Sequence, residues 1–397
     1  MSWVGRSTAA MGIGLLIAAS AHAQELPSAP LSLAGGRVTL GTDISLSASP
    51  QNDEGAYFNY TDYSHSTTRL LRIGVTTDIH LTDRVSFLGE VRSENGDRIR
   101  PYAFYLRVRP WKDRAIDIQA GRIPPTFGAF SRRTYADGNL LIGYPLAYQY
   151  LTSLRADAVP ADADQLLRMR ARGWRPSYTI GSPAIGTGMP LVSAFRWGTG
   201  AEVRIGSEQL MMSAAVTNGS ISNPDGNDNS GKQISGRLQW QPRVGLVLGA
   251  SSAEGPYLAD TVRKLLGGPG SSSQRAFGFD AEYSRDHWLV RTEGVWNRWQ
   301  MPTLSTPLKA TGAFVEGSYK VLPGVFVAAR LDQLTFNRIS STSQTRTWDA
   351  PVTRFEAGLG YYIQRNLLAK VTAQQNRRDG GLIRRRNQFA VQLQFWL

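Results

Sequence analysis

The stretch FAVQLQFWL, residues 389–397, alternates between apolar and polar side chains. One parity holds Phe389, Val391, Leu393, Phe395 and Leu397, and the other holds Ala390, Gln392 and Gln394. Because successive side chains of a β-strand point to opposite faces, this stretch predicts a strand with one apolar and one polar face. A globular domain usually follows such a strand with a polar, fraying tail. Since the sequence ends here, we expect the strand to find its partner elsewhere in the chain.

The same alternation recurs from residue 37 onward. Residues 68–81, for example, place Ile73, Val75 and Ile79 on one face and Arg72 and Asp78 on the other. We expect strands at residues 37–48, 68–81, 84–94, 100–111, 115–123, 194–206, 209–218, 232–241, 244–254, 274–284, 288–299, 309–321, 325–337, 352–363, 367–376 and 384–397. About sixteen strands is an even number of the kind that bacterial outer-membrane barrels use.

The connections alternate in length. Short turns fall at 82–83, 112–113, 207–208, 242–243, 286–287, 323–324 and 365–366, and longer polar loops lie between them. This asymmetry is typical of membrane barrels, which have short periplasmic turns and longer outer loops. The last strand is then expected to pair with residues 37–48 and close the sheet. The sequence therefore predicts an all-β fold, a transmembrane antiparallel β-barrel of about sixteen strands.

Residues 1–23 have the form of a secretory signal peptide. Arg6 precedes a short apolar run, and Ala21 and Ala23 flank His22 in the A-x-A pattern of a cleavage site. We expect residues 24–397 to form a single barrel domain in the outer membrane. The chain of 397 residues carries a net charge of +13 and has a pI near 10.1. An exported chain is not expected to meet nucleic acid, so the lipid bilayer, lipopolysaccharide and small anionic or polar solutes are the expected partners.

The polar parity of the strands is expected to face a water-filled lumen. Residues 100–111, for example, should point Tyr102 and Phe104 to lipid and Arg107 and Arg109 to the lumen. The inward set includes Arg72, Arg92, Arg107, Arg109, Arg196, Arg204, Arg237, Arg291, Arg330, Arg354, Lys370, Arg384 and Arg386, with Glu90, Glu202, Glu293, Glu316, Asp332 and Glu356. Two interpretations stay open: the arginines pair with carboxylates and stabilise the wall, or they form an anion-attracting lining. A large soluble β protein, with its tryptophans in cores, is the alternative to the barrel.

Residues 125–191 form the longest connection, and a connection of this length usually has a function. It follows the fifth expected strand and is rich in aromatic and basic residues. In this position it resembles the inward-folded loop of general outer-membrane porins, and the alternating C-terminal strand resembles the insertion signal of outer-membrane proteins. Residues 121–130, GRIPPTFGAF, also look like a signature of the phosphate-selective (polyphosphate) porin family.

The porin resemblance implies a constriction formed by the loop, and a homotrimer. Arg132, Arg133 and Arg155 are then candidates for the narrowest point, with Asp137 as an opposing carboxylate. Arg72, Arg107, Arg109, Arg196 and Arg354 would extend the anion-attracting surface along the wall. The remaining arginines of the loop, Arg168, Arg170, Arg172 and Arg175, are candidates for contacts with lipopolysaccharide phosphates.

No catalytic or metal-binding pattern emerges from the sequence. The chain has no cysteine, and His65, His80 and His287 have no serine and acidic partner at an interpretable spacing. Asp225 and Asp228 in the loop 223–231 are best explained as polar turn residues rather than calcium ligands. We therefore expect a passive, weakly anion-preferring porin that is not an enzyme and has no cofactor or bound metal. The alternatives are a barrel with a blocked lumen that acts as an adhesin or structural protein, and a lipid-modifying barrel enzyme.

Overall fold

The computed structural model describes residues 29–51, 57–61, 65–111, 115–224, 231–266 and 272–397. Each of the sixteen expected strands is present, with boundaries that differ by a few residues. They are β2 (Val38–Ala48), β3 (Leu70–Thr82), β4 (Val85–Glu94), β5 (Arg100–Val108), β6 (Ala115–Arg122), β9 (Thr199–Gly206), β10 (Leu210–Asn218), β11 (Lys232–Arg243), β12 (Leu246–Pro256), β13 (Ser273–Arg285), β14 (Trp288–Trp299), β15 (Leu308–Leu322), β16 (Val325–Phe336), β19 (Val352–Gln364), β20 (Leu367–Arg378) and β21 (Arg385–Trp396).

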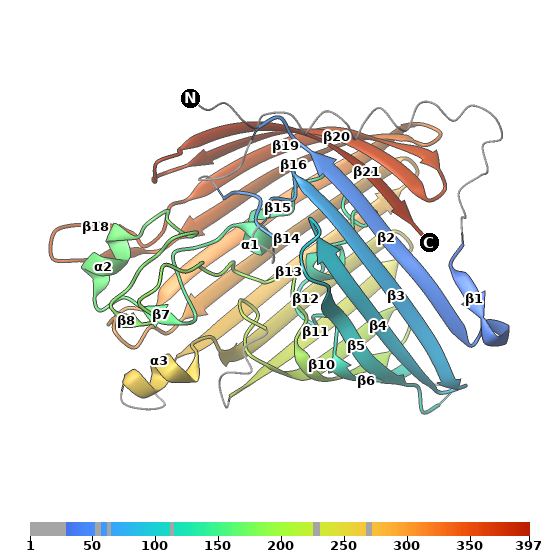
Figure 1. Cartoon of the computed structure of the whole chain (residues 1–397), viewed down its shortest axis with the longest axis horizontal. Helices are drawn as coiled ribbons and strands as arrows, with labels where there is room; N and C mark the ends of the chain where they lie inside the picture. Colours follow the sequence, from blue (N-terminus) through green and yellow to red (C-terminus); the bar gives the residue numbers. More distant parts are fainter. Residues whose placement is uncertain (1–28, 52–56, 62–64, 112–114, 225–230, 267–271) are drawn as a thin grey trace, which may run out of the picture.

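These strands form one closed antiparallel barrel, in which they run obliquely side by side (Figure 1). The ring closes between β2 and β21, with Asp43 opposite Trp396 and Ala48 opposite Val391. One residue further on, the amide of Leu397 donates to the carbonyl of Thr42 at 2.9 Å. The expected pairing of the last strand with the first barrel strand is therefore confirmed. A short additional strand, β1 (Leu31–Leu33), pairs with β2.

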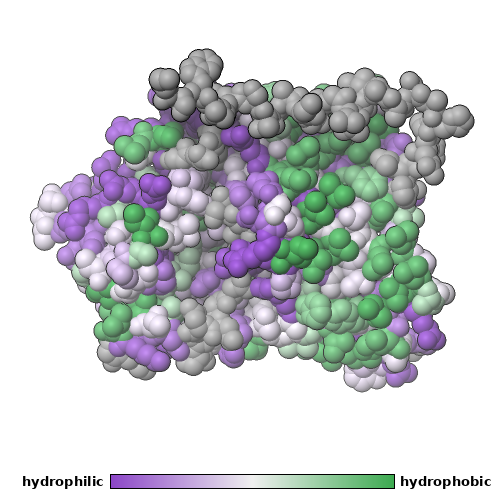
Figure 2. All heavy atoms as spheres, in the orientation of Figure 1, coloured by the Kyte–Doolittle hydropathy of each residue, from purple (hydrophilic) through white to green (hydrophobic). Residues whose placement is uncertain are grey.

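The two faces of the wall differ as the alternation predicts. Phe277 and Leu331 point outward, with 62% and 53% of their surfaces exposed, whereas Arg330 and Glu356 point inward and are buried. Figure 2 shows hydrophobic residues over the strands and hydrophilic residues gathered at the end that carries the long loops. Among the described residues, no helix has both the length and the apolar character needed to cross a bilayer. We call the end of the barrel that carries the long loops the loop end, and the opposite end, with the short connections, the turn end.

Short elements lie among the long connections at the loop end (Figure 1). They are α1 (Leu146–Gln149), β7 (Ala158–Val159), α2 (Ala163–Arg168), β8 (Ile180–Gly181), α3 (Asp260–Leu265), β17 (Arg338–Ser340) and β18 (Thr345–Thr347). Since β6 pairs directly with β9, residues 123–198 between them leave the sheet. This inner segment is longer than the expected loop 125–191, and most of its side chains are buried.

Several expectations about single residues were wrong. Tyr102 points inward, because the register between β4 and β5 shifts at Glu90 and Val91, where an extra residue in β5 reverses the alternation. Arg109 follows the end of β5 and Arg196 precedes β9, so both lie just outside the observed strands, although Arg109 still pairs with the inward Asp117. Three expected features lie outside the described residues: the signal peptide 1–23, the turn 112–113, and Asp225 with Asp228.

Candidate functional site

The part of the inner segment that crosses the barrel is residues 130–139. Its side chains reach two separate parts of the wall: Arg132 pairs with Glu202 of β9 at 3.2 Å, and Arg133 pairs with Glu282 of β13 at 2.7 Å. Its carbonyls accept from wall cations, namely Thr134 from Arg72, Ala136 and Asn139 from Lys370, and Gly138 from Arg291. These partners lie on β3, β9, β13, β14 and β20, so this crossing segment is held from around the ring.

Wall carboxylates hold the backbone amides next to the crossing segment. Glu293 of β14 accepts from the amides of Ala129 at 3.2 Å and Phe130 at 3.0 Å. Glu356 of β19 accepts from the amide of Gly143 at 2.9 Å. Since buried amides must find acceptors, these carboxylates replace the hydrogen bonds that a regular element would supply. The inner charges therefore serve in part to bind the chain that fills the barrel.

Arg72 and Arg354 belong to this structural set. Arg72 is buried, pairs with Glu94 at 2.8 Å and donates to the carbonyl of Thr134. Arg354 is also buried and donates to the carbonyls of Tyr144 at 2.8 Å and Phe58 at 2.6 Å. Their guanidinium donors are directed at protein acceptors, which matches the first of the two interpretations for these residues.

Arg155 lies in a different environment from Arg132 and Arg133. Its side chain is 1% exposed and forms a two-pronged pair with Asp157 at 2.8 and 2.7 Å. It also donates to the carbonyls of Pro176 at 2.9 Å and Ala184 at 2.6 Å. These four contacts stay within the inner segment. The structure thus does not bring Arg155 together with the other two candidates for the constriction.

A cluster of charged side chains lies inside the barrel nearer the turn end, formed by wall residues and by Arg132 of the crossing segment. We define the arginine cluster as Arg107, Arg109, Asp117, Arg132, Glu202 and Arg204. Its carboxylates bridge the arginines: Asp117 lies 2.6 Å from Arg107 and 3.5 Å from Arg109, and Glu202 lies 2.8 Å from Arg204. Asp117 and Arg204 are direct cross-strand neighbours, which joins the two groups. Arg109 is 60% exposed and Arg132 is 34% exposed, so the cluster combines fixed geometry with access to solvent.

The cluster has an excess of positive charge that its own carboxylates do not neutralise. Burial, together with the neighbouring Arg204, lowers the pKa of Arg132 to about 10, although Glu202 opposes the shift. At that value the guanidinium is still charged at neutral pH. Four arginines against two carboxylates leave like charges that repel one another, and an anion at this place would relieve the repulsion.

Two hollows lie inside the barrel, one bordered by the crossing segment and one nearer the loop end. The larger, of about 260 Å³, is bounded by the walls of β2 to β5 and by Tyr135 of the crossing segment. Tyr105, two residues before Arg107 on β5, borders this hollow. The smaller, of about 30 Å³, lies towards the loop end and is lined by residues 123–127, Arg196 and parts of β10 and β11.

Asp137 is exposed and lies on the far side of the crossing segment from Arg132. Its charge acts on Asp43 of β2 and Lys370 of β20, whereas Arg132 contacts β9. In the order of strand pairing, β20 and β9 stand on opposite sides of the ring. The structure therefore places Asp137 and Arg132 beside different parts of the wall.

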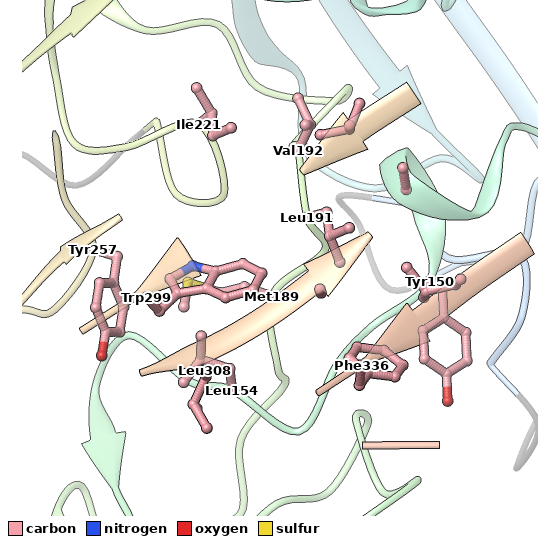
Figure 3. Close-up of a cluster of buried hydrophobic side chains, with 14 of the residues drawn as sticks. Tyr150, Leu154, Met189, Leu191, Val192, Ile221, Tyr257, Trp299, Leu308 and Phe336 are labelled. Carbon is pink, nitrogen blue, oxygen red and sulfur yellow. The ribbon is translucent and has the colours of Figure 1, made fainter. Parts of the chain in front are cut away.

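The loop end is filled by a large apolar cluster. Leu154, Met189 and Leu191 of the inner segment face Trp299, Leu308 and Phe336 of the wall (Figure 3). Asp349, after β18, accepts from the amides of Ser153 at 2.6 Å and Ala171 at 2.8 Å. Burial raises the pKa of Asp349, although these amides oppose the shift. This packing closes much of the loop end beside β14 to β19.

The same region corrects one expectation about surface arginines. Arg170 is buried and donates to the carbonyl of Thr347 at 3.0 Å and to Asp379 at 3.0 Å. It is therefore not a surface group. Arg168, Arg172 and Arg175 are exposed.

The acidic partners of the crossing segment were not distinguished from the sequence. The alternation predicts that Glu202 points inward, but it predicts the same for the other inward carboxylates, so it does not show which of them binds Arg132. Glu282, which binds both Arg133 and Arg291, carries no separate signal in the sequence. Within the described residues, no three or more histidine and acidic side chains gather in a way that could hold a metal ion.

Comparison with solved structures gives the architecture a context, although no family model and no curated protein matches the sequence. The chain aligns over 91% of its length with the anion-selective porin from Comamonas acidovorans, which is covered to 99%, at 9% identity and a TM-score of 0.57. The fold is that of the bacterial porins. OmpF of Salmonella typhi, solved in complex with daunomycin, gives a TM-score of 0.57 at 11% identity, with 91% of this chain and 97% of that chain covered. A trimer form of OmpT, an outer membrane protein of Vibrio cholerae, gives a TM-score of 0.53 at 11% identity, with 91% and 99% covered.

Proposed function

We propose that this protein is an outer-membrane porin, a water-filled channel for the passive diffusion of small hydrophilic solutes with a weak preference for anions. The observation that carries the proposal is the arginine cluster, a solvent-accessible set of charges inside a closed barrel whose outer wall is apolar. The porin fold adds support. The proposal includes export through the signal peptide 1–23, contact with the bilayer and lipopolysaccharide, and a homotrimer like the trimer form of OmpT.

The anion preference follows from the composition of the cluster. It contains four arginines, Arg107, Arg109, Arg132 and Arg204, against two carboxylates, Asp117 and Glu202. Guanidinium groups stay charged and present flat donor pairs that suit carboxylate and phosphate oxygens. A cationic lining lowers the electrostatic barrier for anions and raises it for cations. The solvated Arg133 adds to this field through its position in the crossing segment.

The proposal does not extend to a specific phosphate site at residues 121–130. Ile123, Phe127 and Phe130 of this stretch are buried. Its one cation, Arg122, donates to the carbonyls of Trp197 at 3.1 Å and Pro101 at 2.8 Å. These contacts support a role for the stretch in turning the chain from the wall into the interior.

One observation favours a second candidate, a barrel with a blocked lumen that acts as an adhesin or structural protein. The crossing segment has partners around the ring, and the apolar cluster of Figure 3 fills much of the loop end. Such a barrel would not conduct ions. The proposal as a porin requires the two interior hollows to connect beside β5, β6 and β9.

Planar bilayer recordings of the purified protein separate the candidates. The porin proposal predicts discrete conductance steps and, in a potassium chloride gradient, a reversal potential that indicates anion preference. The double variant Arg132→Gln with Arg133→Gln should move the reversal potential towards cations, because two charges are lost from the solvated interior. Arg155→Gln is the matched control and should leave the potential unchanged, since Arg155 is enclosed by its own segment. Absence of steps would favour the blocked barrel, and an unchanged potential in the double variant would refute the assigned role.

A further inference from the structure

The outer face of the wall carries a row of cations at its loop end. Arg275 of β13 is directly opposite Arg298 of β14, and Arg298 is directly opposite Lys309 of β15. All three side chains are exposed on the outward parity. Arg275 has a carboxylate partner, Glu254, at 2.8 Å. Within the described residues, the side chains of Arg298 and Lys309 make no ion pair.

Such a row is unfavourable in the protein alone. Like charges directly opposite one another in neighbouring strands destabilise the pairing. Among the residues that the structure describes, neither Arg298 nor Lys309 has a compensating carboxylate, although acidic residues are the simplest way to relieve the repulsion. An anion from outside the chain would supply that compensation.

The surface beside this row is apolar. One step closer to the middle of the wall, Phe277 stands opposite Trp296, with 62% and 48% of their surfaces exposed. On the other side of Phe277, Ser252 and Gly236 continue the same cross-strand row with small residues. Here a groove of about 770 Å³ opens, bordered by Ile234 and Phe277 and, at its loop end, by the cations Lys232, Arg263 and Arg275 and the carboxylate Glu254.

We propose that this face, β11 to β15 at the loop end, binds a phosphorylated lipid of the surrounding leaflet. Its phosphates would lie against Arg298, Lys309 and the cations of the groove, and its acyl chains would lie along Phe277, Trp296 and the small residues. Cations above an apolar, aromatic surface fit an amphiphile with an anionic head group. The inference rests on the proposed membrane location, and it names a lipid partner at a place separate from the solute pathway.

A second pair of cations on the same rim provides a matched control. Arg377 of β20 is directly opposite Arg385 of β21, and both are exposed on the outer face. The next outward pair towards the middle of the wall is Gln375 opposite Asn387, which is polar. This pair therefore has the same two charges as Arg298 and Lys309, but its neighbouring outward pair is polar instead of aromatic.

The test uses the full mature chain in detergent micelles, with diphosphorylated lipid A as the probe and native mass spectrometry as the readout. Arg298→Gln with Lys309→Gln should weaken lipid binding by about tenfold, because each cation near an anionic lipid contributes to the affinity. Arg377→Gln with Arg385→Gln should have a much smaller effect. Lipid A without its phosphates should bind weakly to the unaltered chain, and millimolar inorganic phosphate should not displace the phosphorylated lipid.

Three results would overturn the proposal. Equal losses in the two double variants would mean that general rim charge attracts the lipid. Unchanged binding in the first variant would mean that its cations only extend into interfacial water. Displacement by inorganic phosphate would identify a site for the free anion. Because binding is measured without ion flow, these outcomes are independent of the bilayer recordings that test the channel.

Discussion

Gly128 is the residue at which the chain turns towards the crossing segment. Its φ is +75°, and a Cβ placed there would overlap the hydroxyl of Tyr148 and the carboxylate of Glu293. That carboxylate holds the amides of Ala129 and Phe130. The absence of a side chain at Gly128 thus allows the wall to bind the start of the segment.

Gly128→Ala should therefore destabilise the barrel through overpacking. Gly96→Ala is the matched control, because Gly96 has a similar φ of +77° but no atom within 4 Å of a built Cβ. Backbone strain is common to both variants, so we expect Gly128→Ala to lower the free energy of unfolding by about 1–3 kcal/mol more than Gly96→Ala. Urea unfolding of the two refolded variants measures the difference. Equal losses would show that the space at Gly128 is not needed.

For single residues, the sequence predicts which face of the wall a side chain lies on, but not which atoms it binds. The alternation correctly places Arg72 and Arg354 inside. It does not show that they bind the carbonyls of Thr134 and Tyr144, because those acceptors belong to backbone far away in the chain. For Tyr102 the sidedness itself was predicted wrongly. The alternation places this side chain outward, but one extra residue in β5 turns it inward, and the sequence pattern does not show that bulge.

The inner segment is the element that depends most on the wall. Lys370 of β20 is buried, and its ammonium donates to the carbonyls of Ala136 and Asn139. A buried carbonyl that loses its donor costs more than the hydrogen bond itself contributes. Lys370 is therefore a main anchor of the crossing segment.

Lys370→Met should loosen the crossing segment while keeping most of the side-chain volume. We expect the segment to lose about 1–3 kcal/mol of local stability. Amide hydrogen exchange in a peptide covering residues 134–143 should accelerate by about tenfold. Lys320→Met, at an exposed position near the turn end of β15, is the control and should leave that exchange unchanged. Equal exchange in both variants would contradict the assignment of Lys370 as an anchor.

The elements divide sharply in how well sequence predicts them. All sixteen barrel strands follow from alternation of period two, because each strand has one face towards the apolar exterior. The inner segment has no such repeat, since its shape is set by contacts with the wall. Its existence and approximate bounds could be predicted, but the crossing at residues 130–139 and the separation of Arg155 could not.

At the scale of the whole molecule, the ring depends on the ladder between β2 and β21. Six residue pairs, from Asp43–Trp396 to Ala48–Val391, form this ladder. Without it, the backbone of β2 would have an open edge in hydrocarbon, where each unpaired polar group costs several kcal/mol. Closure is therefore a requirement for stability in a membrane.

Deletion of residues 392–397 should prevent the barrel from folding. The deletion removes most of the partners of β2, and we expect loss of the heat-dependent shift in electrophoretic mobility that folded barrels show in detergent. Leu31→Ser with Leu33→Ser is the control, because β1 pairs only with the turn end of β2 outside the ring ladder. A truncated chain that still shifted on heating would refute this account of closure.

The position of the crossing segment constrains the order in which the molecule assembles. Its anchors are spread from Arg72 of β3 to Lys370 of β20, almost the whole length of the chain. A segment with contacts around the whole ring cannot enter a closed barrel, so it must dock while β2 and β21 are still unpaired. The pairing of β2 with β21 should then be the last step of folding. Mutations that delay the docking of the crossing segment should cause open, protease-sensitive sheets to accumulate.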